Sequence, residues 1–520
     1  MPTRFATYLE SSGAALLALF SGAALVLAFS PFDLFLLAVI APALWLQTLQ
    51  GRSPRLAFGL GWLFGIGLFG CGVFWIRISL NEFGNIAPPL AIALTVLFVA
   101  VMALYYGLAG WLLQRLGATR TTASPQQRLA GAVLIFPAVW VLIEWLRGWL
   151  FTGFPWLILG NAALDSPAAG WIPLLGVHGL SLILALSAGL AWAAWRLPRP
   201  RRAVLFLAAL WLSGGFLWLI EWTAPEGEPF TAAVIQGNIE QSLKWETDIL
   251  EPTIATYLSL TKAVLGTELI VWPETAIPDF LHQVRTSLIT PLAADALAAG
   301  SEIVLGIPIM DRPDRYYNSL ISLGTVQDRY DKRHLVPFGE FLPFKTWLRP
   351  LIDWFEVPMS DFSPGAPVAP LLQVGAHQVG VSICYEDVFP ELVREALPTA
   401  AYLINVSNDA WFGDSLAPAQ HLQFARMRAL ENGRPLVRAT NTGISAIIDH
   451  RGRIVEQLAL FERGTVSAEV QPRRGLTPAA RFGNRVALLV AVMLLLGGLI
   501  PLIPTNPTQA RRLLRRTYRR

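Results

Sequence analysis

The sequence has few charged residues and very few cysteines. Only 15% of its 520 residues are Asp, Glu, Lys or Arg, against about 25% in soluble domains, and 54% are hydrophobic. This balance argues against a soluble chain and favours a membrane protein. Of the two cysteines, Cys71 lies in an apolar segment and Cys384 at the end of a strand-like run. We therefore expect no disulfide framework and no cysteine-based zinc site.

The sequence also lacks a concentrated basic surface. Its net charge of +4 comes from short arginine-rich segments, whereas nucleic-acid binding needs clustered basic residues together with aromatic platforms. We expect no nucleic-acid partner. Nothing in the sequence requires a metal or a dissociable cofactor.

What the sequence has in abundance is long apolar stretches. A stretch of about 18 residues or more is a candidate membrane span. We read eight of them, at 11–30, 33–50, 56–79, 88–114, 129–151, 171–195, 203–221 and 485–504. The segment 151–170 is apolar but broken by Gly and Pro, which favours an interfacial or re-entrant path. The predicted organisation is a bundle of seven spans over 1–221, a domain over 222–484, an eighth span over 485–504 and a basic tail over 505–520.

Arginine placement predicts the orientation of this bundle, because cytoplasmic loops carry an excess of Lys and Arg. With eight spans, every arginine-rich connection falls on one side of the membrane, whereas the alternate loops hold almost none. The arginines concerned are Arg4, Arg52, Arg55, Arg115, Arg120, Arg128, Arg196, Arg199, Arg201, Arg202 and those after residue 510. Both ends are thus expected in the cytoplasm and residues 222–484 outside it.

Residues 222–484 have a different composition and read as an α/β domain. Strands are predicted at 231–236, 268–272, 302–305, 316–323, 378–383, 401–406, 436–439, 445–449 and 464–470. Helices are predicted near 247–265, 280–299, 388–397 and 416–431. Strands that alternate with helices favour a layered α/β sheet.

Cys384 stands where a predicted strand gives way to a predicted helix that ends near Leu397. Backbone N–H groups at a helix start stabilise a thiolate and, later, an oxyanion. The alternative is that Cys384 is a small buried hydrophobe, the usual environment of a free cysteine.

Three polar clusters, each after a strand-like run, favour the chemical interpretation. They contain Glu274, then Lys332 with Glu340, then Cys384 with Tyr385 and Glu386. Taken singly, each has a structural explanation: a turn cap, a solvated lysine, a closed loop or a packed thiol. Together they supply a thiol, a carboxylate to take its proton and a lysine to hold negative charge, which are the parts of nucleophilic acyl transfer.

The strings that hold these residues resemble the carbon–nitrogen hydrolase (nitrilase) superfamily. They are WPE at 272–274, YDKRHLVPFGE at 330–340 and CYED at 384–387, accompanied by IQGNIEQSLKW at 235–245, NVSNDAWFG at 405–413 and RATNTG at 438–443. With the apolar stretches around that domain, the whole chain resembles the apolipoprotein N-acyltransferase family of the bacterial inner membrane. The resemblance implies an eight-span helical bundle plus an extracytoplasmic α/β nitrilase-like domain, an α-β-β-α sandwich facing the periplasm.

The resemblance also implies a two-step reaction. Cys384 takes an acyl chain from a membrane phospholipid as a thioester, and the N-terminal amine of an S-diacylglyceryl-cysteine apolipoprotein then accepts it. Glu274 would be the general base, and Lys332 with the backbone N–H of Tyr385 would stabilise the oxyanion. Glu340 and Glu386 would orient Lys332 and the amine.

Trp245, Trp411, Phe412 and Tyr385 are candidates for lining the opening of the site, and Trp411 and Phe412, beside Gly413, could also gate it. Their alternative is interfacial anchoring, since Trp favours that depth in any membrane protein. In the span region, Glu144 and Arg147 are expected to pair on one helix face, either to stabilise the bundle or to contact a lipid headgroup. His334, two residues from Lys332, is expected to be structural.

Two other functions compete with acyl transfer. One is a membrane-anchored amidase or nitrilase that hydrolyses small amides, because soluble relatives use the same three residues. The other is a transporter or assembly factor with an inactive outer domain, which the intact set of Glu274, Lys332 and Cys384 argues against.

Overall fold

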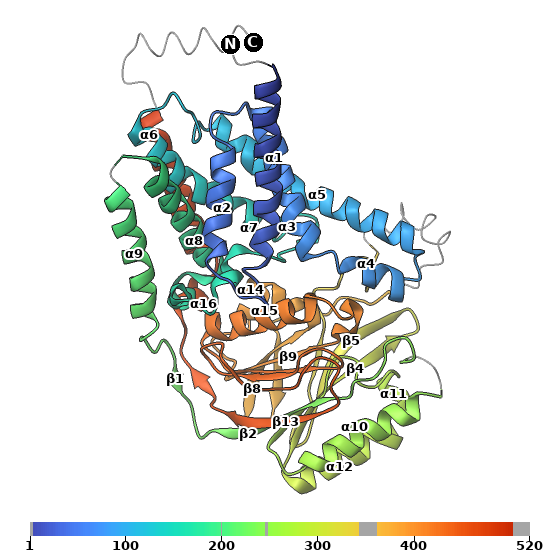
Figure 1. The fold of residues 1–520 in the computed structure, drawn as a ribbon. Coiled ribbons are helices and arrows are strands. Elements are labelled where there is room, and N and C mark those ends of the chain that lie inside the picture. The colour runs from blue at the N-terminus through green and yellow to red at the C-terminus, as the bar shows by residue number, and fades with distance from the viewer. Residues whose placement is uncertain (1–3, 199, 245–247, 343–360, 503–520) are drawn as a thin grey trace.

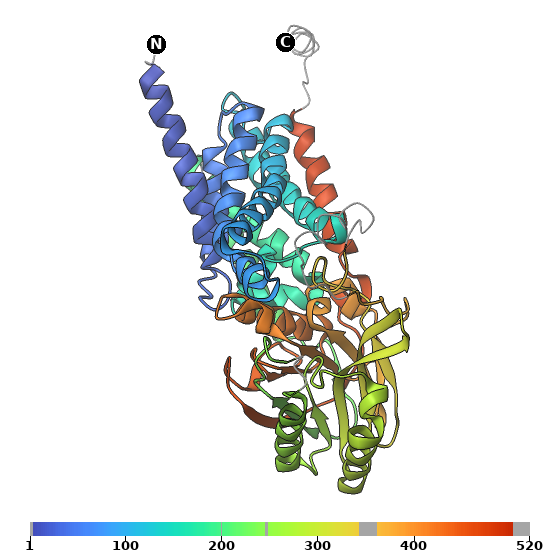
Figure 2. The same ribbon diagram turned by 90° about the vertical axis from the view of Figure 1, so that its right-hand side faces the viewer.

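The protein consists of a helical bundle stacked on a domain built around two six-stranded β-sheets (Figure 1, Figure 2). The computed structural model describes residues 4–198, 200–244, 248–342 and 361–502. The candidate residue Trp245 and the predicted tail 505–520 lie outside this described part.

A helix overlaps each of the eight predicted apolar stretches. These are α1 (Arg4–Val26), α2 (Leu37–Thr48), α3 (Pro54–Gly72), α5 (Pro88–Arg115), α6 (Pro125–Ala130) continued by α7 (Phe136–Arg147), α8 (Ile172–Arg196), α9 (Pro200–Leu217) and α17 (Arg485–Leu499). Among the described residues, four helical runs are long and apolar enough to cross a membrane: Pro54–Gly72, Pro88–Arg115, Pro125–Arg147 and Pro167–Arg196. The count of eight spans therefore remains a prediction.

Glycine allows the helices of the bundle to approach one another closely. A Cβ atom on Gly61 of α3 would lie 2.1 Å from the carbonyl oxygen of Tyr106 on α5, and one on Gly22 of α1 would lie 1.9 Å from that of Phe64. Small residues at helix contacts are typical of membrane bundles, where backbones must approach closely to gain packing energy. The centre is aromatic, with the Trp45 ring 4.9 Å from that of Phe64 and 5.8 Å from that of Trp140.

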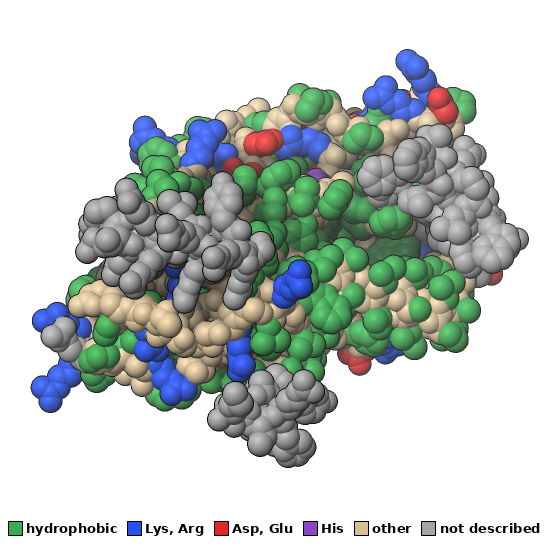
Figure 3. All heavy atoms as spheres, turned by 90° about the horizontal axis from the view of Figure 1, so that it is seen from above, with side chains coloured by type: hydrophobic (Ala, Val, Ile, Leu, Met, Phe, Trp, Pro, Cys, Tyr) green, Lys and Arg blue, Asp and Glu red, His purple; other side chains and the backbone are tan. Residues whose placement is uncertain are grey.

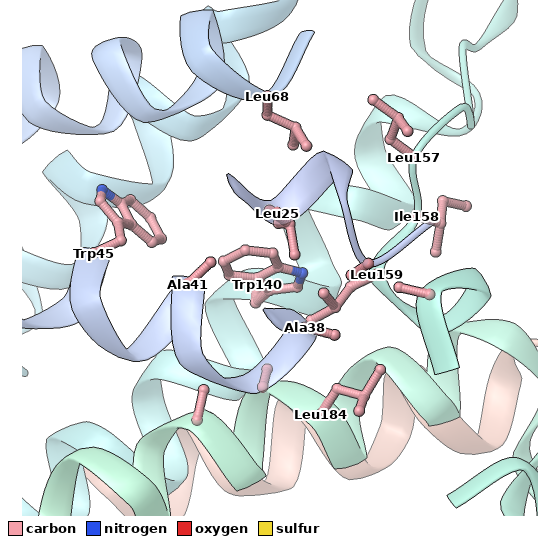
Figure 4. Packing of buried hydrophobic residues seen from close by; sticks show 14 of the residues in the cluster. Leu25, Ala38, Ala41, Trp45, Leu68, Trp140, Leu157, Ile158, Leu159 and Leu184 are labelled. Carbon is pink, nitrogen blue, oxygen red and sulfur yellow. The ribbon is translucent and has the colours of Figure 1, made fainter. Parts of the chain in front are cut away.

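The segment 151–170 does not form a single spanning helix, as expected, and its interfacial or re-entrant path in the membrane stays a prediction; we call it the re-entrant segment below. It folds into the short turns η3 (Leu150–Thr152), η4 (Leu159–Ala163) and η5 (Pro167–Trp171). Leu157, Ile158 and Leu159 belong to the apolar core of the bundle, and Figure 4 shows Leu159 beside Trp140. A broken backbone at this depth must be satisfied by protein groups.

Glu144 and Arg147 supply those groups. Arg147 Nη1 donates to the carbonyl oxygens of Phe154 at 2.6 Å and Trp156 at 2.5 Å. Glu144 Oε1 accepts from the backbone N–H of Leu159 at 2.8 Å. Both residues are only 1% exposed. Each bonds separately to the re-entrant segment and holds it in place, rather than facing lipid headgroups.

The second domain is a four-layered α-β-β-α sandwich. One sheet has the order β12-β11-β10-β9-β8-β7 and the other β13-β2-β3-β4-β5-β6. Valine and isoleucine side chains of the two inner faces pack against each other, among them Val234, Val304, Val381 and Ile404. Helices α10 (Leu250–Val264), α11 (Leu281–Val284) and α12 (Thr290–Ala299) cover one outer face.

The strands predicted from the sequence are confirmed. They are β2 (Phe230–Gln236), β3 (Leu269–Val271), β4 (Glu302–Arg312), β5 (Arg315–Leu323), β8 (His377–Ile383), β9 (Leu403–Ser407), β10 (Leu436–Thr440), β11 (Ala446–Ile448) and β13 (Gly464–Val470). The sequence reading missed the short strands β1 (Ala224–Pro225), β6 (Arg329–Asp331), β7 (Leu371–Val374), β12 (Ile454–Gln457) and β14 (Arg473–Arg474).

The predicted helix after Cys384 is wrong in form. A 3-10 turn, η7 (Cys384–Val388), is followed by a helix of five residues, α14 (Pro390–Arg394). The chain must turn sharply here because Cys384 itself has φ +53°, which no regular α-helix contains.

Helix α15 (Ala417–Asn432) joins the two domains. Leu422, Ala425 and Ala429 pack toward the sheet with α14, whereas Phe424 and Met427 belong to the apolar core of the bundle. Figure 1 shows the helix lying between the sheets and the bundle. Both faces of α15 are therefore covered by protein.

Candidate active site

Glu274, Lys332 and Cys384 converge at one edge of the sandwich. Each follows the end of a strand, β3, β6 and β8 respectively. Lys332 Nζ lies 3.2 Å from Glu274 Oε1 and 2.9 Å from Glu340 Oε1. The sequence placed these residues in three separate clusters, and the fold brings them together.

Lys332 is fully buried, at 0% exposure. Burial by itself lowers the pKa of a lysine, but the Glu274 and Glu340 carboxylates outweigh it and raise the pKa of Lys332 well above its ordinary value. The ammonium therefore stays charged at neutral pH. A fixed cation without water around it is the kind of group that stabilises an oxyanion strongly.

Glu274 is held by two asparagines that the sequence reading gave no role. Asn318 Nδ2 donates to Glu274 Oε1 at 2.7 Å and to Glu340 Oε1 at 3.0 Å. The backbone N–H of Asn408 donates to Glu274 Oε2 at 2.9 Å. Asn408 lies in the string NVSNDAWFG, which was a signal for it, whereas Asn318 sits inside β5 with no signal around it.

Close backbone approach places Glu274 at this point. A Cβ atom on Gly306 of β4 would lie 2.7 Å from the Cα atom of Glu274 and 2.5 Å from the carbonyl oxygen of Pro273. Thr275, the next residue, has φ +47°. Positive φ at a residue other than glycine is uncommon and gathers at functional sites, and Cys384 shares this feature.

Cys384 is buried, with 8% of the residue exposed, and it belongs to the apolar core between the two sheets. Burial raises the pKa of Cys384 well above its ordinary value, and the Glu274 carboxylate raises it further, whereas Lys332 lowers it. The thiol is therefore protonated at rest and needs a base when it attacks. The α-helix start that the sequence suggested for stabilising a thiolate is replaced here by the 3-10 turn η7.

Glu386 is fully buried and binds mainly backbone. Its Oε2 accepts from the N–H of Ile383 at 2.8 Å, and its Oε1 from the N–H of Arg333 at 2.7 Å and of His334 at 3.1 Å. Tyr330 donates its hydroxyl to the same carboxylate at 3.0 Å. The carboxylate thus connects the loop after Lys332 to the strand end before Cys384. Its full burial corrects the expectation that Glu386 orients the incoming amine.

His334 faces apolar rings rather than the thiol. Its ring centroid lies 4.0 Å from that of Phe389. Burial, with a smaller effect of Lys332, lowers the pKa of His334 to about 4, so the ring is neutral at neutral pH. This environment agrees with a structural residue.

The site touches the bundle through aromatic residues. The Tyr385 hydroxyl donates to the carbonyl oxygen of Gly153, in the re-entrant segment, at 3.2 Å. The Phe412 ring lies 4.6 Å from Trp75, and the Trp411 ring 5.3 Å from Phe83 in η1 (Ser79–Phe83). Trp411 is 40% exposed.

No group of three or more His, Cys, Asp or Glu residues in the described ranges is arranged to hold a metal ion. The groups at the centre of the site are an ammonium, two carboxylates and a thiol, and both carboxylates form ion pairs with Lys332.

Two family descriptions match the sequence. Residues 21–190 match the apolipoprotein N-acyltransferase N-terminal domain, and residues 231–478 match carbon-nitrogen hydrolase. The chain is 44% identical to the apolipoprotein N-acyltransferase of Methylococcus capsulatus over 91% of this chain and 94% of that one. It is also 44% identical to the enzyme of that name from Nitrosomonas europaea, over 92% of this chain and 95% of that one.

The chain belongs to the apolipoprotein N-acyltransferase family. A solved structure, Saccharomyces cerevisiae Nit3 of the nitrilase superfamily, is similar to 48% of this chain and 93% of its own, with 21% identity and a TM-score of 0.37. The family match covers both domains, so the resemblance read from the motif strings holds for the bundle as well as for the sandwich.

The charges around Cys384 predict that two substitutions shift the pKa of its thiol in opposite directions. In a Cys71→Ser chain, Lys332→Met removes the cation that lowers the Cys384 pKa, so alkylation of Cys384 by iodoacetamide should need a higher pH. Glu274→Gln removes a charge that raises it, so alkylation should occur at a lower pH. Both variants should nevertheless lose about 100-fold or more in turnover, because an oxyanion donor or a base is gone.

Mass spectrometry of the alkylated Cys384 over a pH series checks this. Lys262→Met, which removes an exposed lysine on α10, is the matched control and should leave the profile unchanged. Shifts of the same sign in the Lys332 and Glu274 variants would contradict the arrangement.

Proposed function

We propose that the protein transfers an acyl chain from a membrane phospholipid, through a thioester on Cys384, to the N-terminal amine of S-diacylglyceryl-cysteine apolipoproteins. Family membership supports the reaction class. The observation that carries the mechanism is the meeting of Glu274, Lys332 and Cys384 directly against the re-entrant membrane segment, where Tyr385 contacts Gly153.

In the first half-reaction, the Cys384 sulfur attacks the ester carbonyl of the phospholipid while Glu274 takes the thiol proton. The protonated Lys332 and the backbone N–H of Tyr385 stabilise the tetrahedral oxyanion. The carbon–oxygen bond then breaks, and the leaving alkoxide recovers the proton from Glu274. The products are a lysophospholipid and the Cys384 thioester.

In the second half-reaction, the α-amine of the acceptor attacks the thioester carbonyl while Glu274 removes a proton from the amine. The carbon–sulfur bond then breaks as the amide forms, and the leaving sulfur takes the proton from Glu274, which restores the thiol and the carboxylate. Because a thioester transfers readily to an amine, one nucleophile serves both halves in a ping-pong cycle. Glu340 orients Lys332, and Glu386 positions the two loops that carry Lys332 and Cys384.

The orientation proposed is that of a multi-pass protein of the bacterial inner membrane with the catalytic domain, residues 222–484, facing the periplasm. The start of α1 and the end of α17 lie at the end of the bundle remote from the sandwich (Figure 2). Seen from that end, a broad apolar surface carries scattered Lys and Arg side chains (Figure 3). The arginine-rich connections of the sequence, which alternate with loops almost free of Lys and Arg, support a cytoplasmic location for this end and eight crossings.

The thioester is the decisive test. The purified protein is incubated with phospholipid carrying a labelled acyl chain and then digested, and the label is expected on the peptide that contains Cys384. Adding a diacylated lipopeptide should discharge the label to the lipopeptide amine. Cys384→Ala and Cys384→Ser should lose both steps.

Transfer to the lipopeptide by either Cys384 variant would refute the mechanism. Consumption of soluble amides without phospholipid, and without label on Cys384, would favour the amidase function instead.

A second expectation concerns the rim formed by Trp411 and Phe412, which we propose line and gate the lipid opening. Replacing both with Ala removes two aromatic contacts, each worth about 0.5–1.5 kcal/mol, and should raise the KM for phospholipid several-fold. Trp195→Ala removes an equally apolar ring, 59% exposed, from the opposite end of the bundle. Equal effects of the two changes would indicate interfacial anchoring.

The orientation is checked in intact cells with single cysteines introduced into a Cys71→Ser, Cys384→Ser chain. Lys262→Cys, on the outer helix α10, should react with a membrane-impermeant maleimide. Arg120→Cys, in an arginine-rich connection, should react only after lysis. The reverse result would place the catalytic domain in the cytoplasm.

A further inference from the structure

A ring of four charged side chains lies buried behind Cys384. The members of this His421 network are Asp387, Asp409, His421 and Arg438, each at most 1% exposed. His421 Nδ1 lies 2.7 Å from Asp409 Oδ1, and its Nε2 lies 3.0 Å from Asp387 Oδ1. Arg438 lies 2.9 Å from Asp409 and 3.4 Å from Asp387. Two cations thus bridge the same two anions out of contact with water.

The network connects the turn that carries the nucleophile Cys384 to the turn that binds the base Glu274. Asp387 belongs to η7, whose first residue is Cys384, and His421 Nε2 also lies 3.3 Å from the Cys384 carbonyl oxygen. Asp409 begins η8 (Asp409–Phe412). The residue before it, Asn408, donates its backbone N–H to Glu274.

His421 also lies against the re-entrant segment. Its ring centroid is 6.0 Å from that of Trp156 and 6.1 Å from that of Phe412. The neighbouring residue on α15, Gln420, accepts from Trp156 Nε1 at 2.6 Å. The helix that carries His421 is therefore fixed to the re-entrant segment at the same level.

We infer that His421 is a positioning residue, which ties the Cys384 turn to the Asn408–Asp409 turn through both ring nitrogens and so fixes the thiol relative to Glu274. It acts through backbone and carboxylate groups and touches no reacting atom. The kinetic consequence rests on the proposed acyl transfer, whereas the geometric one does not.

Both ties require a protonated ring, because imidazolium donates at both nitrogens and neutral imidazole at only one. Burial and Arg438 lower the pKa of His421, but Asp387 and Asp409 outweigh them and raise it to about 9, from 6.5. The charged groups that face the ring are Asp387 from η7, Asp409 from η8 and Arg438 from β10. The ties are thus complete at neutral pH, and one is lost as the pH rises through about 9.

The experiment measures kcat and KM of the full-length protein in detergent across pH 6–11, with labelled phospholipid and a diacylated lipopeptide. Wild type should lose kcat as the pH rises through about 9. Asp387→Asn removes a carboxylate that keeps the ring charged, so the fall should move to lower pH by about one unit or more. His421→Gln should remove that fall and lower kcat at neutral pH by roughly tenfold to 100-fold, with KM unchanged.

The matched control is Asp165→Asn, which breaks the Arg426–Asp165 ion pair of the same helix at 2.5 Å without touching the network. Its pH profile should coincide with that of wild type. A helix-packing role for the network would lower the melting temperature in all variants without moving the profile. Coincident profiles for Asp387→Asn, Asp165→Asn and wild type would overturn the inference.

If Asp387→Asn is not recovered folded, His421→Gln decides alone, and a kcat fall at the wild-type pH would overturn the inference. The rate of Cys384 alkylation by iodoacetamide, in Cys71→Ser chains, requires no acyl substrate. In Asp387→Asn, the pH dependence of this alkylation rate should be displaced to lower pH relative to wild type, as the fall in kcat is. Failure of acyl transfer with a displaced alkylation profile would refute the proposed function and leave the positioning role standing.

Discussion

The buried ammonium of Lys332 is the constraint on which the active site depends. An isolated charge in a protein interior is unstable by several kcal/mol, so the fold must bring carboxylates to it, and it brings Glu274 and Glu340. Those carboxylates need donors in turn, which Asn318 and the backbone of Asn408 and Val336 provide. One buried cation thereby determines the arrangement of three separate loops.

A similar dependence connects the site to the bundle. The segment 151–170 is broken within an apolar environment, and Glu144 and Arg147 satisfy its backbone. That segment contacts Tyr385 through Gly153 and α15 through Trp156. Glu144 and Arg147 thus stabilise the segment on which Tyr385 and α15 pack, although both residues lie far from Cys384 in the sequence.

Periodicity and composition predicted a layered α/β sheet, its longer strands and the apolar helices. The α-β-β-α form of the domain was implied by the resemblance of the motif strings, and Glu274, Lys332 and Cys384 were singled out by three polar clusters that follow strand-like runs. The sequence did not predict the 3-10 turn at Cys384, because the left-handed backbone there is imposed by the surrounding structure. Asn318 and His421 escaped notice since each lies in an ordinary strand or helix pattern. Their significance arises from contacts between residues distant in the chain.

Helix α15 has no face that could be presented to water. Its residues Phe424, Met427 and Leu430 complete the apolar core of the bundle, and its other side completes the sandwich. A catalytic domain excised from this chain would therefore expose a hydrophobic stripe along α15 and would associate or aggregate. Converting this acyltransferase into a freely dissolved enzyme would require redesigning that stripe, in addition to deleting the spans.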